Sequence, residues 1–175
     1  MNEVLDAIKT RRSVKAYKPD MVPQELIDQV IEAGTWAPTG MNRQAPVILA
    51  VTDKVIRDRL SDMNRRVMGA PEGMDPFYGA PVVLVVLADR DAALTWQYDG
   101  SLVLGNMLLA AHALGLGGCW IHRAKEEFET EEGKAILEKA GLTGNLVGIG
   151  HCVIGYPKDG LPTPKPRKDG WVAKL

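Results

Sequence analysis

Cations gather at two places in this sequence, one near each end. Residues 9–18, KTRRSVKAYK, hold five lysines and arginines and no acid, and residues 165–168 hold three more cations. Arginine can bind a phosphate through two parallel hydrogen bonds, and Ser13 adds a hydroxyl beside Arg11 and Arg12. These residue types predict an anion site. The alternative is a solvated helix end, where the helix dipole favours cations without any ligand.

A turn-rich loop carries a second group of polar side chains. Residues 37–46, APTGMNRQAP, include the neutral donors and acceptors Thr39, Asn42 and Gln44. Such groups suit the edge of a heterocycle such as a pyrimidine or a flavin. Loops of this composition are also common where no ligand binds, so the residue types alone leave both interpretations open.

Two histidines lie at the end of, or within, apolar segments. His122 directly follows GGCWI and is interpreted either as a proton donor or substrate contact, or as a surface histidine at a strand end. His151 and Cys152 are neighbours in an apolar segment, and neighbouring residues of a strand face opposite ways. No joint metal site is therefore expected, and both side chains are predicted to pack in the core.

Four motifs in a particular order make the sequence similar to a known family. RRSVKAY, WAPTGMNRQAP, LGLGGCWI, and IGYP followed by PKPRK span residues 11–168, which is nearly the whole chain. Their order and spacing resemble the FMN-dependent nitroreductase family. The resemblance implies an α+β, nitroreductase-like sandwich whose central, mainly antiparallel sheet is flanked by helices. It also implies a homodimer with FMN at the subunit interface.

The resemblance assigns cofactor roles to both cation clusters. The residues expected to hold the phosphate and ribityl chain of FMN are Arg11, Arg12, Ser13, Lys165 and Arg167. Lys15 is expected near the N1–O2 edge of the flavin, where a cation favours the anionic reduced form. Lys15 and His122 are therefore the candidate catalytic residues.

The remaining cofactor contacts are expected from the loop, a helix and a strand end. The loop residues expected to reach FMN from the other subunit are Pro38, Thr39, Gly40, Asn42 and Gln44. Asn64 is expected at flavin O2 or N3. Ile121, His122 and Arg123 are expected near flavin N5, with the N–H of Arg123 as a donor. The best-known group of the family has an acidic residue and a glycine after the isoleucine, so nicotinamide and acceptor preference do not carry over.

The implied activity is that of an FMN-dependent NAD(P)H oxidoreductase. NADH or NADPH would reduce FMN at N5, and a nitroaromatic, quinone or similar small molecule would then take two electrons in a ping-pong mechanism. One alternative is a flavin-binding or storage module with little turnover. Another is a specialised relative, either a reductive dehalogenase or a flavin-cleaving enzyme.

Length and composition set limits on what the chain can be. Its 175 residues, 46% hydrophobic and 25% charged, predict one flavin-binding domain over residues 1–175, with 157–175 as an extended C-terminal tail. A formal net charge of −1 argues against general attraction to nucleic acid or membrane. Two cysteines and no signal-peptide pattern favour the cytoplasm.

The residues singled out above depend on helices and strands to position them. Helices are expected at residues 2–11, 22–34, 53–68, 92–114 and 125–140, and strands at 47–51, 81–88, 117–121 and 145–154. The uncharged residues 100–122 could span a bilayer by length, but their glycines favour a buried helix that packs on a second copy. Residues 69–79 are predicted to form a mobile loop. An open pocket is expected beside it, lined by Met68, Met74, Phe77 and Tyr78.

Overall fold

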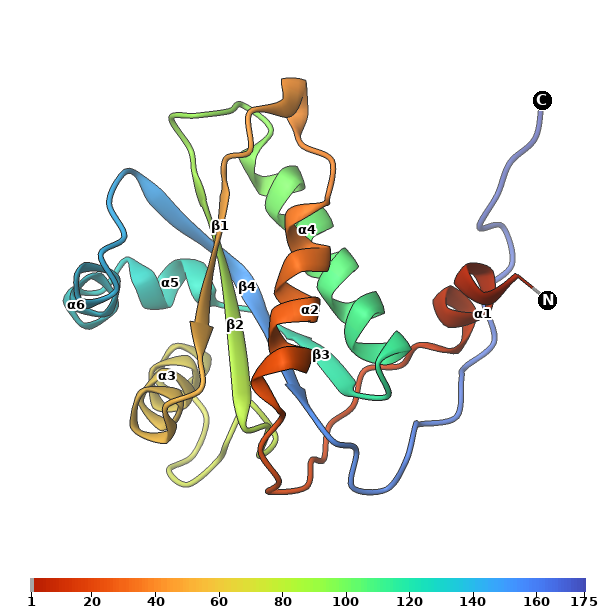
Figure 1. The fold of residues 1–175 in the computed structure, drawn as a ribbon, viewed down its shortest axis with the longest axis horizontal. Helices are drawn as coiled ribbons and strands as arrows, with labels where there is room; N and C mark the ends of the chain where they lie inside the picture. The colour runs from red at the N-terminus through yellow and green to blue at the C-terminus, as the bar shows by residue number, and fades with distance from the viewer. Residues whose placement is uncertain (1) are drawn as a thin grey trace.

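A four-stranded antiparallel sheet forms the centre of the molecule in the computed structural model, which describes residues 2–175 (Figure 1). The strands are β1 (Pro46–Val51), β2 (Val82–Asp89), β3 (Gly117–Ile121) and β4 (Leu146–Gly155), in the order β1-β2-β4-β3. The helices are α1 (Glu3–Thr10), α2 (Gln24–Thr35), the short 3-10 helix η1 (Gly40–Asn42), α3 (Lys54–Met68), α4 (Trp96–Ala113), α5 (Ala124–Phe128) and α6 (Glu131–Lys139). The expected α+β sandwich is confirmed.

Helices cover both faces of the sheet and create two cores. Helices α2 and α4 pack on one face, and α3, α5 and α6 pack on the other (Figure 1). Strand β2 lies between the cores, and every residue from Val82 to Ala88 is buried. Val83 and Val85 face one core while Val82 and Leu84 face the other, because successive strand residues point to opposite sides. This burial explains the continuous β-branched segment in the sequence.

Helix starts follow from side chains that cap them. The Asn2 side chain accepts a hydrogen bond from the Leu5 N–H at 3.1 Å, and Asp53 accepts one from the Ile56 N–H at 2.9 Å. Helix α4 starts at Trp96, four residues later than predicted, because residues 90–95 form turns after β2. In the part of the chain that the structure describes, no helix has the length and hydropathy needed to cross a membrane.

The helix predicted over residues 125–140 is two helices. Thr130 separates α5 from α6: its hydroxyl accepts from the Gly133 N–H at 3.0 Å and donates to the Glu127 carbonyl at 2.6 Å. A capping threonine ends one helix and starts the next, which overrides the continuous helical pattern. As a result, α5 is a short helix that lies directly on β4.

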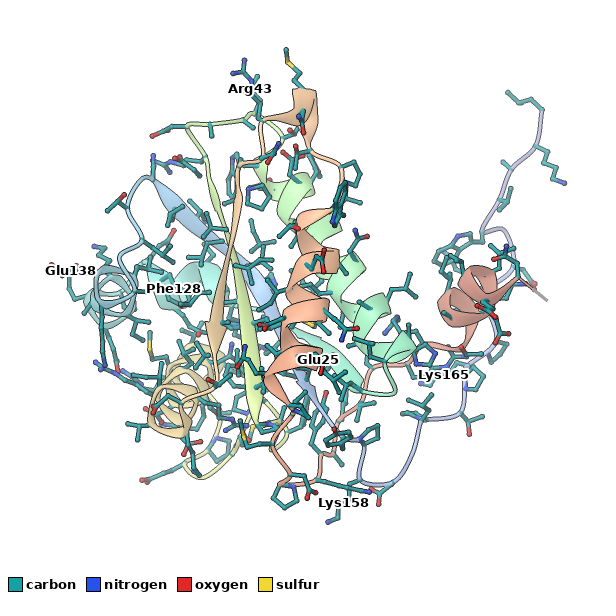
Figure 2. All side chains as sticks on the ribbon, viewed as in Figure 1. Glu25, Arg43, Phe128, Glu138, Lys158 and Lys165 are labelled. Atoms are coloured by element: carbon teal, nitrogen blue, oxygen red, sulfur yellow. The ribbon has the colours of Figure 1, made fainter. Side chains whose placement is uncertain are left out.

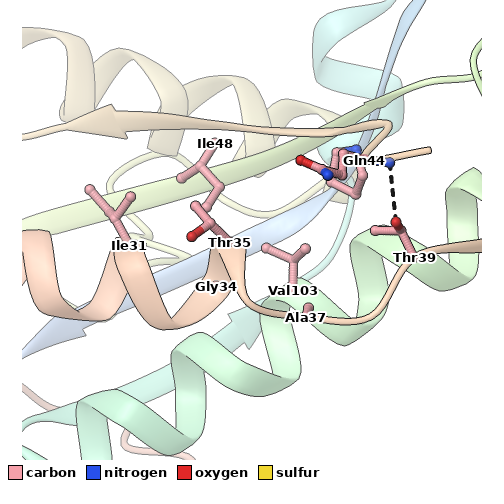
Figure 3. A pocket seen from close by; sticks show the side chains of 9 residues that line it. Ile31, Gly34, Thr35, Ala37, Thr39, Gln44, Ile48 and Val103 are labelled. Carbon is pink, nitrogen blue, oxygen red and sulfur yellow. Dashed lines mark hydrogen bonds between the residues drawn. The ribbon is translucent and has the colours of Figure 1, made fainter. Parts of the chain in front are cut away.

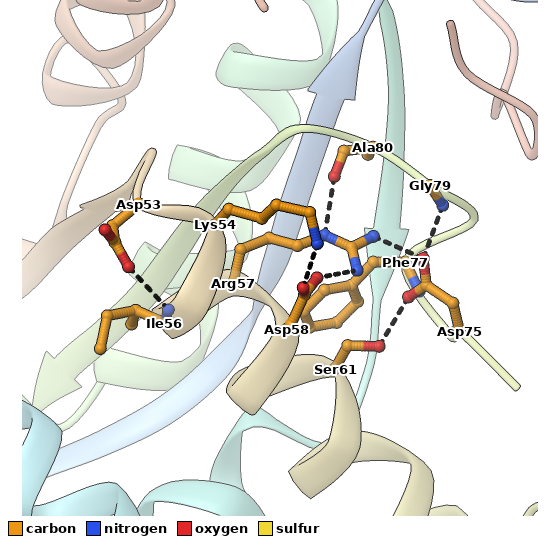
Figure 4. A network of polar contacts seen from close by, with 10 residues as sticks. All are labelled: Asp53, Lys54, Ile56, Arg57, Asp58, Ser61, Asp75, Phe77, Gly79 and Ala80. Atoms are coloured by element: carbon orange, nitrogen blue, oxygen red, sulfur yellow. Dashed lines mark hydrogen bonds and ion pairs between the residues drawn. The ribbon is translucent and has the colours of Figure 1, made fainter. Parts of the chain in front are cut away.

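The segment predicted to be mobile is held by an acid. Asp75 accepts hydrogen bonds from Ser61 at 2.6 Å, from the Phe77 N–H at 2.9 Å and from the Gly79 N–H at 2.7 Å (Figure 4). Arg57 adds an ion pair to Asp75 at 2.5 Å. Phe77 is fully buried against the His151 ring, so its predicted place in the pocket lining is wrong. The glycine- and proline-rich composition did not reveal this anchor.

The C-terminal segment leaves the sheet beside the segment that follows α1. The Lys18 N–H donates to the Tyr156 carbonyl, and the Lys158 N–H donates to the Ala16 carbonyl. Residues 158–175 are exposed and contain no helix or strand. Figure 1 shows them extending toward the end of the molecule that carries α1.

Candidate functional site

The N-terminal cation cluster lies against β3. The Val14 N–H donates to the Gly118 carbonyl at 3.1 Å, and Ser13 forms a parallel bridge with Gly118. A Cβ on Gly117 would stand 2.8 Å from a methyl of Val14, closer than real contacts allow. The glycines of GGCWI therefore let the chain between Arg11 and Lys15 approach the strand.

Both arginines of the cluster carry buried nitrogen atoms without a partner. Nη1 of Arg11 and Nε of Arg12 are buried, and neither has a hydrogen-bond acceptor among the described residues. Nη1 of Arg12 donates to the Lys9 carbonyl at 2.7 Å and to the Arg11 carbonyl at 2.6 Å, at the end of α1. Arg12 thus acts partly as a helix-end cation, while the free N–H groups of both residues require an anion or water.

Burial and the positive charge of the cluster shift the pKa values of two nearby groups. Burial lowers the pKa of His112, and the charges of Arg11 and Arg12 lower it further. Burial raises the pKa of the Cys119 thiol, opposed by a Ser13 hydrogen bond and the charge of Lys15. Cys119 is therefore a protonated thiol at neutral pH, which argues against a role as a nucleophile.

A small cavity lies at the end of β3. It has a volume of about 130 Å³ and is lined by Met68, Met74, Pro76, Tyr78, Trp120, Ile121, His122 and Arg123. The ammonium of Lys15 lies 5.8 Å from the centre of the Tyr78 ring. The structure thus brings the cation cluster to the same region as the strand end. His122 itself is exposed beside this cavity.

The backbone of Arg123 is left-handed, with φ of 82°. Non-glycine residues rarely adopt this conformation, and Arg123 occupies the position where the family resemblance expects glycine. Among residues 2–175, no hydrogen bond uses the Arg123 N–H. Although arginine stands where the family resemblance expects glycine, the backbone keeps the conformation typical of glycine, and the Arg123 N–H is free to donate.

Asn64 does not face this cavity. It is fully buried beneath the turn, and its amide nitrogen donates to the His122 carbonyl at 2.7 Å and to Glu127. Its oxygen accepts from the Arg123 guanidinium at 3.3 Å. The expected contact of Asn64 with flavin O2 or N3 does not fit this geometry, because its amide is fully buried and already paired with groups of the chain itself.

Two buried polar residues of this region are paired with each other. The predicted burial of His151 is confirmed, and Glu127, which the sequence motifs did not single out, is also fully buried and lies within hydrogen-bond distance of His151, at 3.1 Å. A signal for Glu127 exists in the sequence. Ala124 and Phe128 flank it at helical spacing, which places all three on one buried face.

The loop that follows α2 is held by another residue that sequence reasoning missed. Asp99 accepts from the Gly40 N–H at 3.0 Å and from the Thr95 hydroxyl at 3.1 Å. Within the loop, the Gln44 N–H donates to the Thr39 hydroxyl at 3.1 Å, and the Gln44 amide donates to Asn42 at 3.2 Å. Pro38, Asn42 and Gln44 remain exposed.

Three residues of this loop have left-handed backbones. They are Met41, Asn42 and Gln44, with φ values of 51°, 53° and 50°. Conformations of this kind cost about 1–3 kcal/mol each and persist where surrounding structure imposes them. With Tyr78 and Arg123, these are all the non-glycine residues of positive φ within residues 2–175. Backbone strain is thus confined to the candidate site regions.

A cavity of about 290 Å³ lies beside the loop, between α2, α4 and β1. Figure 3 shows Ile31, Ile48 and Val103 on its walls, and Thr39 and Gln44 at one end. Its apolar walls suit packing more than recognition of a charged ligand. It therefore adds no partner for the cation cluster.

The loop and the cation cluster lie at opposite ends of α4. The loop binds Asp99 near the start of the helix, whereas Thr10 lies 2.8 Å from His112 near its end. Thirteen residues of helix separate these contacts by about 20 Å. Figure 2 shows Arg43 of the loop at the top of the view, away from α1. A single chain therefore does not bring the two groups together.

The tail cations have no polar partner among the described residues. Lys165 and Arg167 are exposed, and no hydrogen bond or ion pair among residues 2–175 involves their side chains. Figure 2 shows Lys165 at the same end of the molecule as α1.

Residues 2–175 also contain no cluster of three His, Cys, Asp or Glu side chains that could hold a metal ion.

Known proteins resemble this chain in sequence and in fold. The profile described as Nitroreductase family matches residues 8–156. The chain is 38% identical to the NADH dehydrogenase of Thermus thermophilus, with 91% of each chain covered. It is 28% identical to the FMN reductase (NAD(P)H) of Bacillus subtilis, over 95% of this chain and 70% of that one. A Bacteroides fragilis nitroreductase structure with bound FMN superposes with a TM-score of 0.89, at 29% identity and full coverage of both chains.

Proposed function

This chain belongs to the nitroreductase family, and on that premise we propose that it is an FMN-dependent NAD(P)H oxidoreductase. The observation that carries the proposal is the pair of buried, unpartnered arginine nitrogens beside β3, in a fold shared with an FMN-bound nitroreductase. A phosphate is the anion that satisfies such donors best. FMN, when bound, supplies two-electron chemistry: its N5 accepts a hydride from NADH or NADPH and passes the electrons to a second substrate.

The phosphate end of FMN is held by the cation cluster. Arg11 and Arg12 direct their unpartnered N–H groups to the phosphate, and Ser13 contributes its exposed hydroxyl. Lys165 and Arg167 are drawn from the exposed tail to the same anion by electrostatic attraction. FMN binding on this account orders part of the tail.

The turn at the end of β3 would hold the reacting end of FMN. Ile121 ends that strand, and the free Arg123 N–H would be the donor to N5. Lys15 places a positive charge at the N1–O2 edge, where negative charge develops on reduction. His122 projects into solvent beside the cavity and contacts the incoming substrate or gives it a proton.

A homodimer completes this site. Pro38, Thr39, Gly40, Asn42 and Gln44 lie too far from the cation cluster to serve it in their own subunit, so they reach the FMN of the partner. Large apolar side chains beside this loop support an interface: Trp36, Met41 and Leu94 are 79%, 87% and 100% exposed in the single chain. Light scattering of the flavin-loaded protein should give twice the monomer mass of 19.1 kDa.

The electron acceptor is a small nitroaromatic, quinone or similar oxidant. The cavity beside Met68, Met74 and Tyr78 is small, and the exposed His122 in its lining leaves it open to solvent, which favours a permissive site over a selective one. Both cysteines are free and buried, which agrees with a reducing cytoplasm.

One spectroscopic experiment tests the activity. The protein purified with excess FMN should show a flavin absorbance band that NADH or NADPH bleaches within seconds and that a quinone or nitroaromatic restores. A protein that binds FMN but is not bleached by either nicotinamide would be a storage module. A protein that leaves added FMN free in solution would contradict the proposed function altogether.

A further inference from the structure

Three polar side chains from different elements meet in the core beneath the turn at residues 121–123. Asn64 comes from α3, Glu127 from α5 and His151 from β4, and each is 0% exposed. His151 Nε2 lies 3.1 Å from one Glu127 oxygen, and the other Glu127 oxygen accepts from the Asn64 amide. Polar groups at this depth are costly unless every one of them is paired.

The hydrogen-bond partners determine where the protons are. His151 Nδ1 lies 3.2 Å from the Ile121 carbonyl, which can only accept, so Nδ1 carries a hydrogen. One proton then remains between His151 Nε2 and Glu127, and the pair has no net charge whichever atom holds it. A neutral pair explains how both groups remain buried without a counter-ion.

The three side chains act on the backbone of the turn. His151 binds the carbonyl of Ile121, and Asn64 binds the carbonyl of His122 and the guanidinium of Arg123. Apolar residues could hold α5 on the sheet, but they could not bind these two carbonyls. The peptide group between His122 and Arg123, which carries the free N–H, and the peptide group before it are thus both oriented from the interior.

Close packing leaves the network little freedom to shift. A Cβ on Gly148 would lie 2.3 Å from the Ala124 carbonyl group, so the start of α5 rests directly on β4. Helix α5 therefore keeps Glu127 between His151 and Asn64. Because α5 has no room to move toward β4, we expect a change in the network to shift the turn instead.

We propose that Asn64, Glu127 and His151 are positioning residues that hold the turn so that the Arg123 N–H meets flavin N5 in the reactive geometry. This inference rests on the proposed function, because it needs FMN at that turn. Displacements of about 1 Å can slow a reaction on the order of a hundredfold. The expected signature is slower hydride transfer with little change in FMN affinity, since the phosphate contacts lie elsewhere.

The test compares three variants with the wild type. Glu127→Leu removes both acceptors, whereas the amide of Glu127→Gln can accept from Asn64 and donate to a neutral His151. Phe128→Leu loosens the same helix and leaves the network intact. Stopped-flow reduction of FMN by NADH should slow tenfold or more in Glu127→Leu, with the FMN Kd within threefold of wild type. Glu127→Gln and Phe128→Leu should remain within threefold in both measurements.

A second readout does not depend on flavin. Hydrogen–deuterium exchange of the peptide covering residues 119–127, in protein without FMN, should accelerate in Glu127→Leu and not in Glu127→Gln. If Glu127→Leu does not fold, Asn64→Ala replaces it, because it frees the His122 carbonyl and leaves the Glu127–His151 pair in place.

The outcomes separate this inference from the proposed function. Wild-type protein that never binds FMN or is never reduced contradicts the function, whatever the variants do. Wild-type protein that is reduced normally, together with Glu127→Leu reduced at the same rate, overturns the positioning role. Equal slowing in Phe128→Leu overturns it too, because loosening of α5 would then be a sufficient cause.

Discussion

Two polar regions of the molecule, the turn at residues 121–123 and the loop at residues 38–44, are built in different ways. The turn at residues 121–123 is braced from inside by buried Asn64, Glu127 and His151. The loop at residues 38–44 is held by Asp99, has three left-handed residues and exposes most of its side chains. Buried side chains of the same chain hold the turn in place. The loop, in contrast, exposes strained backbone to solvent.

This difference indicates which contacts a single chain can complete. Buried hydrogen bonds hold the braced turn whether or not anything binds outside it. The loop keeps its shape at a cost in backbone strain, which a partner surface could offset by burying Trp36 and Met41. The predictions below test the two regions separately.

The largest effect is expected at the cation cluster beside β3. Arg11→Ala removes a buried N–H donor that has no other partner, so FMN binding should weaken by about 1.5–3 kcal/mol. Arg12→Ala should weaken it less, because one Arg12 nitrogen already serves the end of α1. Fluorescence titration of FMN measures both, with the exposed Lys139→Ala as control. Unchanged FMN affinity in both arginine variants would contradict the proposal that these arginines bind the FMN phosphate.

The next effect concerns the anchor of the loop. Asp99→Ala leaves the Gly40 N–H and the Thr95 hydroxyl without their acceptor, which should lower the free energy of unfolding by about 2 kcal/mol. Asp99→Asn keeps one acceptor oxygen and should lose about half as much. Urea unfolding compares the variants. If both equal the wild type, the loop does not depend on Asp99 and the contrast between the two regions weakens.

A smaller effect is expected from backbone strain at the turn. Glycine tolerates the φ of 82° at Arg123, whereas alanine does not, so Arg123→Gly should be more stable than Arg123→Ala by about 1 kcal/mol. Both variants lose the same guanidinium contact with Asn64, which makes them a matched pair. Equal unfolding midpoints in urea would mean that the turn is not strained.

The smallest effect is a pH dependence beside the braced turn. Burial raises the pKa of Asp75, but hydrogen bonds from Arg57 and Ser61 outweigh it and hold the pKa below its ordinary value of 3.8. A lowered pKa stabilises the fold above the unfolded value, and this contribution is lost as pH falls through the folded value. The stability advantage of wild type over Asp75→Asn should therefore be full at neutral pH and shrink below about pH 4.

Thermal melting across this pH range measures the Asp75 effect. Asp20→Asn changes an exposed acid outside the network and serves as the control. An advantage of the wild type that stays constant down to about pH 2 would show that the Asp75 carboxylate does not hold residues 69–79.

Much of the fold was predictable because its signals are local. Asn2 and Asp53 mark helix starts through their own side chains, and the β-branched segment of β2 reflects burial on both faces. The break at Thr130 was missed because a threonine caps one helix only when the chain turns there. Residues 69–79 were misjudged because Ser61 and Arg57, which bind Asp75, lie on another element.

The sequence by itself determined the two cation clusters, the polar loop and the order of the motifs, since these depend on residue type and spacing alone. Only the tertiary structure decided that Asn64 lies beneath the turn, that Glu127 and His151 are paired, and that the loop and the arginines stand at opposite ends of α4. The physical reason is that burial and hydrogen-bond partners depend on contacts between elements distant in sequence. A polar residue looks alike in a sequence whether it faces water or another buried polar group.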